Sequence, residues 1–162
     1  MSLRAALVLL LREPRLEELR ARFDPEGTAK GLPLHITLLF PFGAHEDGVG
    51  ELFARWSPLR FSLTRVEEFP GVVWLAPEPD EELRELILEL HARYPQYPPY
   101  GGEFSEPIPH ATLGKGDVAE AVRAEAGPLL PVEFEVGAAT LLEEVAPDRW
   151  RRGKSFPFEG TR

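Results

Sequence analysis

Short runs of apolar residues extend along this chain, and the spacing within each run predicts either a strand or a helix. Strict alternation, as in residues 59–66, is typical of a half-buried strand, whereas apolar residues three and four apart, as in residues 80–94, are typical of an amphipathic helix. Residues 24–33 carry Gly and Pro and are predicted to form a loop. Together these patterns predict strands at 3–11, 34–40, 59–66, 71–75, 108–115 and 150–158, a long strand or strand pair at 132–145, and helices at 14–23, 48–56, 80–94 and 117–126.

Two of the predicted strands carry the same four-residue pattern of a His, an apolar residue, a Thr and a Leu. The copies begin at His35 and at His110, 75 residues apart (110 − 35), so each half of the 162-residue chain holds one copy. Two of the four His residues would match this pattern by chance with a probability of about 0.001 at this composition. The repeat therefore indicates a function to which both halves contribute.

The residue types in this repeat are suited to proton transfer beside an anion. Residues i and i+2 of a strand project from the same face, so each copy presents its His and its Thr together. The pKa of imidazole lies near neutrality, so His35 and His110 facing one pocket can act as one base and one acid. The hydroxyls of Thr37 and Thr112 can hydrogen-bond an anionic oxygen. The alternative is that both His residues are half-buried strand residues with satisfied hydrogen bonds.

Composition and charge narrow the classes of function. A net charge of −9 and a pI near 5.0 argue against a broad basic groove for long nucleic acid, but not against a small anion or a single RNA end. The absence of Cys excludes a disulfide framework, a thiol nucleophile and a thiolate metal site. A metal hydrolase that uses both His residues is disfavoured, because no His-Glu-x-x-His motif or His/Asp cluster supplies further ligands. We therefore expect neither a metal nor a cofactor.

The apolar runs are too short to cross a bilayer. The run at residues 5–11 is bounded by charged residues and is followed by a helical pattern rather than a signal-peptide cleavage site, so a cytoplasmic protein is predicted. The chain has no Asn, no Cys and one Met, a composition typical of a thermophile, although GC-rich coding produces part of the same bias.

Two further segments each have two interpretations. Residues 94–109, rich in Pro and Tyr, form either a connector between two lobes or a flap whose aromatic rings stack on a base. The basic run of residues 149–154 either protects an edge strand from aggregation or holds an RNA phosphate. His45 and His91 have no partner pattern and are predicted to lie at the surface.

The two motifs and their flanks resemble the paired His-x-Thr-hydrophobic signatures of the two-histidine (2H) phosphoesterases, the superfamily of 2′-5′ RNA ligase-like proteins and RNA 2′,3′-cyclic phosphodiesterases. Members commonly carry an aromatic residue five positions after the first His, where this chain has Phe40. They commonly carry a basic residue five positions after the second His, where it has Lys115. The chain length, the motif in each half and the final predicted strand also resemble the family, so the resemblance spans most of the chain.

The resemblance implies an α+β fold in which residues 1–162 form one bilobal domain. This domain would be a pseudo-symmetric duplication with two antiparallel sheets, outer helices and a central cleft where both motif strands meet. It also implies metal-free phosphodiester chemistry in which His35 and His110 are catalytic and Thr37 and Thr112 hold phosphate oxygens. Family precedent leans toward His35 as the acid and His110 as the base, but the two positions are pseudo-symmetric and the sequence leaves this assignment open.

Lys115 and Phe40 both lie five residues after a motif His, so strict alternation sends them to the opposite face of the strand. The family commonly has Arg at the position of Lys115, and a Lys supplies a point charge in place of a planar fork. Contact between Lys115 and a phosphate requires a strong twist of the strand or a bulge after Gly114, and the alternative is a solvated strand end. Phe40 is predicted to lie in the core, and the alternative is that it borders a base pocket.

The sequence thus predicts a two-histidine phosphodiesterase acting on 2′,3′-cyclic phosphates of RNA ends or nucleotides, with chemistry that also allows reverse 2′-5′ RNA ligation. The alternative is a binding module with little or no catalysis that recognises a phosphorylated ribose or RNA end. Both motifs are intact, which favours the enzyme, because a pure binder needs no matched acid and base. The expected partner is a small anionic nucleotide or RNA end, with no membrane partner, and the sequence does not indicate the oligomeric state.

Overall fold

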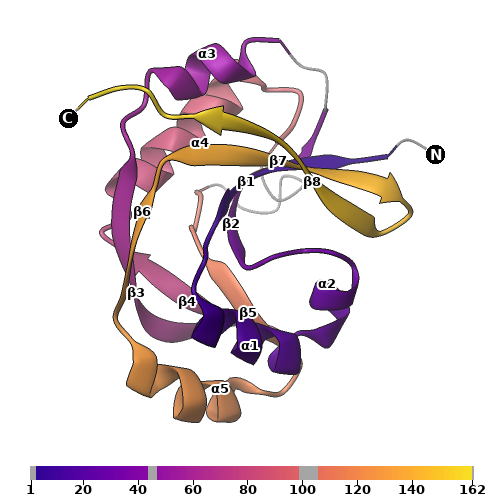
Figure 1. Ribbon diagram of the computed structural model, residues 1–162, viewed down its shortest axis with the longest axis vertical. Helices are drawn as coiled ribbons and strands as arrows, with labels where there is room; N and C mark the ends of the chain where they lie inside the picture. Colours follow the sequence, from indigo (N-terminus) through magenta and orange to yellow (C-terminus); the bar gives the residue numbers. More distant parts are fainter. Residues whose placement is uncertain (1–2, 44–46, 99–105, 162) are drawn as a thin grey trace.

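The fold is that of a computed structural model in which residues 3–43, 47–98 and 106–161 are described (Figure 1). The strands are β1 (Ala5–Leu10), β2 (His35–Phe42), β3 (Leu59–Phe69), β4 (Val72–Glu78), β5 (Ala111–Lys115), β6 (Val132–Val136), β7 (Ala138–Ala146) and β8 (Arg149–Pro157). The helices are α1 (Pro14–Phe23), α2 (Pro25–Ala29), α3 (Val49–Ala54), α4 (Glu81–Arg93), α5 (Ala119–Ala126) and the 3₁₀ helix η2 (Gly127–Leu129).

The strands form one antiparallel sheet in the order β6-β3-β4-β5-β2-β1-β7-β8. The expected antiparallel strands and outer helices are confirmed, but the two separate sheets that the resemblance implied are not. Ile36 of β2 pairs with Ala111 of β5, and this bridge joins the four strands on one side to the four on the other. Backbone pairing between the two motif strands is the physical reason that the halves form a continuous sheet.

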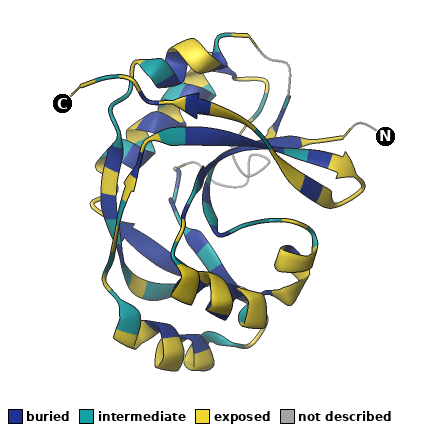
Figure 2. Ribbon diagram, viewed as in Figure 1, coloured by how far each residue is buried: buried dark blue, intermediate teal, exposed yellow. Residues whose placement is uncertain are grey.

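Helices α1, α3, α4 and α5 cover one face of the sheet in two groups, which Figure 1 shows at opposite ends of the molecule. Helices α1 and α5 pack on β5, whereas α3 packs on β8 and α4 packs on β2. Their outer faces are exposed and the strands beneath them are largely buried (Figure 2). One continuous apolar core lies between the helices and the sheet. The opposite face of the sheet is therefore the face that remains for function.

The sequence prediction was wrong about residues 24–33, which contain the short helix α2. The side chain of Asp24 caps this helix by accepting a hydrogen bond from the amide of Gly27 at 3.1 Å. Asp24 also lies 3.4 Å from the guanidinium of Arg20, and both side chains are buried. This buried ion pair fixes the chain that leads into β2.

Both motif strands contain a register shift at the same place in the motif. On β2, Thr37 pairs with Val8 of β1, but the next pair joins Leu39 to Leu7. On β5, Thr112 pairs with Trp74, but the next pair joins Gly114 to Val73. Each strand thus inserts one extra residue after its Thr, and a bulge of this kind reverses the alternation that follows.

The Pro- and Tyr-rich segment is partly core. Tyr94 is fully buried, and the ring of Tyr97 lies 5.2 Å from that of Phe42. Residues 94–98 therefore help to attach the end of α4 to β2. Residues 99–105 of the predicted flap, including Tyr100 and Phe104, lie outside the described residues, as does His45. His91 is half-buried, with a buried Nε2 atom, rather than at the surface.

The bulge of β5 depends on a close approach of helices α1 and α5. A Cβ atom on Gly114 would lie 2.8 Å from Val118 and 3.1 Å from Phe23. We expect Gly114→Ala to lower the free energy of unfolding by about 1–3 kcal/mol through overpacking. The measurement is urea unfolding followed by circular dichroism.

Gly127→Ala is the matched control, because a Cβ at Gly127 meets nothing within 4 Å and the backbone there is helical. We expect this variant to be neutral or slightly more stable. Equal stability of the two variants would contradict the tight packing inferred at Gly114.

Candidate active site

The four polar side chains of the repeat lie on one face of the sheet. Because Ile36 pairs with Ala111, the antiparallel register places His35 opposite Thr112 and Thr37 opposite His110. All four polar side chains are half-buried. The apolar residues of the repeat point the other way and are at most 2% exposed: Ile36, Leu38, Ala111 and Leu113. The structure therefore brings the two motifs together at the junction of the halves.

Each motif His is held by the main chain two residues before it. Nδ1 of His35 lies 2.6 Å from the carbonyl oxygen of Pro33, and Nδ1 of His110 lies 2.7 Å from that of Ile108. A carbonyl oxygen only accepts, so Nδ1 is the protonated donor in both rings. Proton exchange at either residue must then use Nε2. The two imidazoles are thus oriented in the same way by the same local geometry.

Burial disfavours the protonated form of both imidazoles. Burial lowers the pKa of His35 to about 4. The hydrogen bond to Pro33 opposes this shift, and the positive charge of Arg20, together with that of His110 when it is protonated, reinforces it. Burial also lowers the pKa of His110, opposed by its hydrogen bond to Ile108. A neutral imidazole with Nδ1 protonated can accept a proton at Nε2. A nearby anion would raise both pKa values and favour the protonated, acidic form.

Arg20 is a buried positive charge next to His35 that the sequence did not single out. Its Nη1 donates to the carbonyl oxygen of Leu32 at 2.5 Å, just ahead of the Pro33 carbonyl that holds His35. It is 5% exposed and is partly neutralised by Asp24. Arg20 therefore affects His35 in two ways. It fixes the segment that carries the Pro33 carbonyl, and its positive charge lowers the pKa of His35.

His110 lies against an aromatic wall. The ring of Phe69 stands edge-on to it at 5.1 Å, and the ring of Trp74 at 5.7 Å. The indole Nε1 of Trp74 is buried and has no hydrogen-bond partner among the described residues. Sequence reasoning missed both aromatic residues. The pairing of β4 with β5 puts Trp74 opposite Thr112, and the sequence carries no local signal for that pairing.

Phe40 does not lie in the main core, contrary to the sequence prediction. The bulge after Thr37 restores it to the face of the motif, where it packs beside a second apolar cluster that includes Val8 and Trp150. Its ring meets that of Trp150 at 5.8 Å, and the guanidinium of Arg4 lies over it at 5.3 Å. Phe40 thus borders the His35 side of the site.

Lys115 is brought to the same face by the equivalent bulge. It pairs with Val72, two residues from Trp74 on β4, and Trp74 pairs with Thr112. The bulge lies at Leu113, before Gly114 rather than after it, and it reverses the alternation in the way that phosphate contact requires. Lys115 is exposed and has no ion pair within the described part of the chain. Its position permits contact with an anion near Thr112, and that contact stays a prediction.

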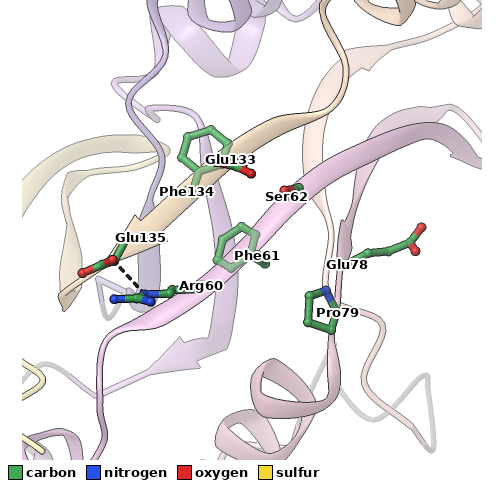
Figure 3. Close-up of a pocket in the computed structure, with 8 residues that line it drawn as sticks. All are labelled: Arg60, Phe61, Ser62, Glu78, Pro79, Glu133, Phe134 and Glu135. Carbon is green, nitrogen blue, oxygen red and sulfur yellow. Dashed lines mark ion pairs between the residues drawn. The ribbon is translucent and has the colours of Figure 1, made fainter. Parts of the chain in front are cut away.

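A pocket of about 670 Å³ elsewhere on the sheet lacks the chemistry of the motifs. Figure 3 shows it lined by residues of β3, β4 and β6, with Arg60 paired to Glu135 at 2.9 Å. The other charged residues that line it are Glu78 and Glu133. This excess of carboxylates would repel a phosphate, so we place the candidate site at the motif residues.

Within the described residues, no group of three or more His, Asp or Glu side chains is arranged to hold a metal ion. Likewise, none of the helices in the described ranges is both long and apolar enough to cross a membrane.

The depressed pKa of His35 makes stability depend on pH. The folded pKa, about 4, lies below the ordinary value of 6.5, so between these values the unfolded state binds more protons. Stability therefore falls as the pH drops from 6.5 to 4, by at most about 3 kcal/mol from this residue. We expect His35→Gln to lose less stability across this window than the unaltered protein in urea unfolding, and equal losses would contradict the buried neutral imidazole.

Comparison with known proteins places this geometry in a family. The 2′-5′ RNA ligase superfamily matches residues 10–148. No curated protein sequence matches the chain. The fold is similar to that of LigT from E. coli in complex with NADP+, with 24% identity over 96% of this chain and 97% of that chain and a TM-score of 0.61.

Two other solved structures share the fold. One, described as a phosphoesterase, is 23% identical over 98% of this chain and 99% of that chain, with a TM-score of 0.64. TT0787 of Thermus thermophilus is 21% identical over 98% of this chain and all of that chain (100%), with a TM-score of 0.62. The chain belongs to the 2′-5′ RNA ligase superfamily, the two-histidine phosphoesterases.

Proposed function

We propose that this protein is a metal-independent phosphodiesterase that hydrolyses 2′,3′-cyclic phosphates of RNA ends or nucleotides. The observation that carries the proposal is the matched pair of imidazoles. His35 and His110 lie on one face, and each uses Nδ1 for a main-chain hydrogen bond, so that each has Nε2 for proton transfer. Such a pair can supply a base and an acid to the two sides of one phosphorus atom.

In the proposed reaction, one neutral imidazole accepts a proton from water while the water oxygen forms a bond to phosphorus. The bond from phosphorus to one ribose oxygen breaks, and the second imidazole, protonated at Nε2, gives its proton to the departing alkoxide. The product is a phosphomonoester with a free neighbouring hydroxyl. With a 5′-hydroxyl in place of water, the same pair would form a bond from that oxygen to phosphorus while the bond to the ribose 3′-oxygen breaks and this oxygen is protonated, which gives a 2′-5′ linkage.

Substrate binding supplies the protonated imidazole. Burial keeps the pKa values of His35 and His110 low in the resting protein, and the negative phosphate raises them when it occupies the site. The acid is therefore charged chiefly when an anion is present to be cleaved. The imidazole in line with the leaving oxygen is the acid. The family resemblance favours His35 in that role.

Thr37 and Thr112 are proposed to hold the non-bridging oxygens. Each lies opposite the His of the other motif, so each hydroxyl can donate to an oxygen placed between the two rings. Donors that already point toward the developing charge stabilise it without reorganisation. Lys115 is proposed to add a positive charge at the β5 side.

Ligands reported for LigT support an anionic nucleotide as the substrate class. LigT has been crystallised with NADP+, 3′-AMP, ATP and phosphate, and each of these ligands carries a phosphate group. We propose that the present chain binds ligands of the same class.

Single replacement of either imidazole tests the proposal. We expect His35→Ala and His110→Ala each to lower the rate of hydrolysis of 2′,3′-cyclic mononucleotides by about 10²–10⁴-fold. The assay contains EDTA and uses chromatography to follow product and to distinguish 2′- from 3′-phosphates. The unaltered protein should give a bell-shaped pH profile that both variants lose.

His91→Ala is the matched control, because it removes an imidazole from α4, on the helix-covered side of the sheet, and should keep most of the activity. Retention of most activity in both motif variants would refute the mechanism. Binding of the nucleotides without any turnover would favour the binding module instead.

Lys115→Gln tests the proposed phosphate contact. Removing a charge-assisted hydrogen bond should raise KM by about tenfold with little change in kcat. Lys154→Gln is the control, because the ammonium of Lys154 lies over the ring of Phe156, away from the motifs. An unchanged KM in Lys115→Gln would show that this strand end is only solvated.

A further inference from the structure

Most positive side chains of this acidic protein are already neutralised. Ion pairs engage eleven of the Arg and Lys residues in the described ranges: Arg4, Arg15, Arg20, Arg22, Lys30, Arg55, Arg60, Arg65, Arg84, Arg123 and Arg151. Three more are held by other groups, since Arg93 and Arg149 donate to backbone carbonyls and Lys154 lies over a ring. Across the described ranges, Arg12, Lys115 and Arg152 are the remaining cations.

These remaining cations share the face of the catalytic motifs. Lys115 reaches it through the β5 bulge. Arg152 pairs with Leu142 of β7, which pairs with Ala6 of β1, and both apolar residues belong to the cluster beside Phe40. Arg12 follows Leu10, the cross-strand partner of His35. In a chain with a net charge of −9, these three cations are thus concentrated on one face and are not spread over the whole surface.

Arg12 and Arg152 line one pocket. It has a volume of about 390 Å³ and lies over β1, β7 and β8, with the end of β6 as one wall. The hydroxyl residues Thr140 and Ser155, which pair with each other across β7 and β8, also line it. The pocket thus combines two guanidinium groups with two neutral hydroxyls.

One carboxylate also borders this pocket. Glu135 is a lining residue, but its side chain is paired with Arg60 at 2.9 Å (Figure 3). The neighbouring acidic pocket has one Arg and three Glu residues, so the two pockets have opposite charge character. The charges of Arg12 and Arg152 are therefore available for an external anion.

The pocket adjoins the candidate active site. Leu10 lines the pocket and pairs directly with His35, and Thr140 pairs with Val8, which pairs with Thr37. Thr140 is on the second strand from β2, so it lies about 10 Å away at the usual strand spacing. A ligand whose reacting phosphate lies between the two His residues could place another phosphate in this pocket.

We propose that the Arg12–Arg152 pocket is a second anion subsite, which binds a phosphate group of the substrate other than the one that reacts. This inference rests on the proposed function and narrows its substrate class. The preferred substrate carries at least two phosphate groups, as in an RNA end or a nucleotide with an additional phosphate. A cyclic mononucleotide would occupy the catalytic part alone.

Three substrates separate the possibilities. Adenosine 2′,3′-cyclic phosphate has no second phosphate, its 5′-phosphorylated form has a terminal one, and a diadenosine ending in a 2′,3′-cyclic phosphate has an internal diester. We expect one of the latter two to have a KM at least about tenfold lower than the first, which corresponds to one charge-assisted contact. The better one identifies whether the subsite takes a diester or a terminal phosphate.

Variants connect this preference to the pocket. We expect Arg12→Gln and Arg152→Gln each to remove most of the preference while leaving turnover of adenosine 2′,3′-cyclic phosphate unchanged. Arg151→Gln is the matched control. It makes the same charge change on the adjacent residue of β8, whose guanidinium pairs with Glu143 and faces the other side. The control should retain the preference.

The outcomes distinguish the two proposals. Turnover of the mononucleotide without any preference for a second phosphate, or a preference that survives both variants, would overturn the subsite and leave the proposed activity intact. If nothing is turned over, binding of 3′-phosphorylated adenosine and diadenosine is compared by calorimetry. Weaker binding of the diadenosine ligand in Arg12→Gln and Arg152→Gln, but not in Arg151→Gln, would support the subsite, and equal binding would overturn it.

Discussion

The site depends on the backbone pairing of β2 with β5 at Ile36 and Ala111. Without this bridge the two halves of the sheet would have no fixed relation, and two imidazoles 75 residues apart (110 − 35) in sequence could not share one face. Both bridge residues are fully buried under the helices, so the apolar core holds the polar face in register. The interaction that joins the halves is therefore also the one that assembles the chemistry.

Much of the fold and the centre of the site could be predicted from the sequence, because alternation and helical spacing are local signals. They were sufficient to place His35, Thr37, His110 and Thr112 on strand faces. Sheet order is non-local, so a single curled sheet could not be distinguished from two. The helix at residues 25–29 was missed because it is only five residues long and contains Gly27, although Asp24 and Pro25 are a local signal for a helix start.

The bulges show why simple alternation failed for Phe40 and Lys115. An extra residue in a strand is visible only in its pairing with a neighbour, and the partners of these strands are distant in sequence. The same bulge occurs at the same point of both motifs, so residues five after each His share its face. Trp74 and Arg20 were missed for a related reason. Both are separated in sequence from the motif residues that they approach, and only the folded chain brings them together.

The hydrogen bond from each motif His to a carbonyl two residues earlier has a consequence for sequence divergence. In many proteins a catalytic imidazole is oriented by another side chain, so two positions must be retained together. Here the orienting group is a main-chain oxygen, which every residue type provides. The surroundings of the pair can therefore change freely while the orientation of both rings persists, which is consistent with a fold shared at low sequence identity.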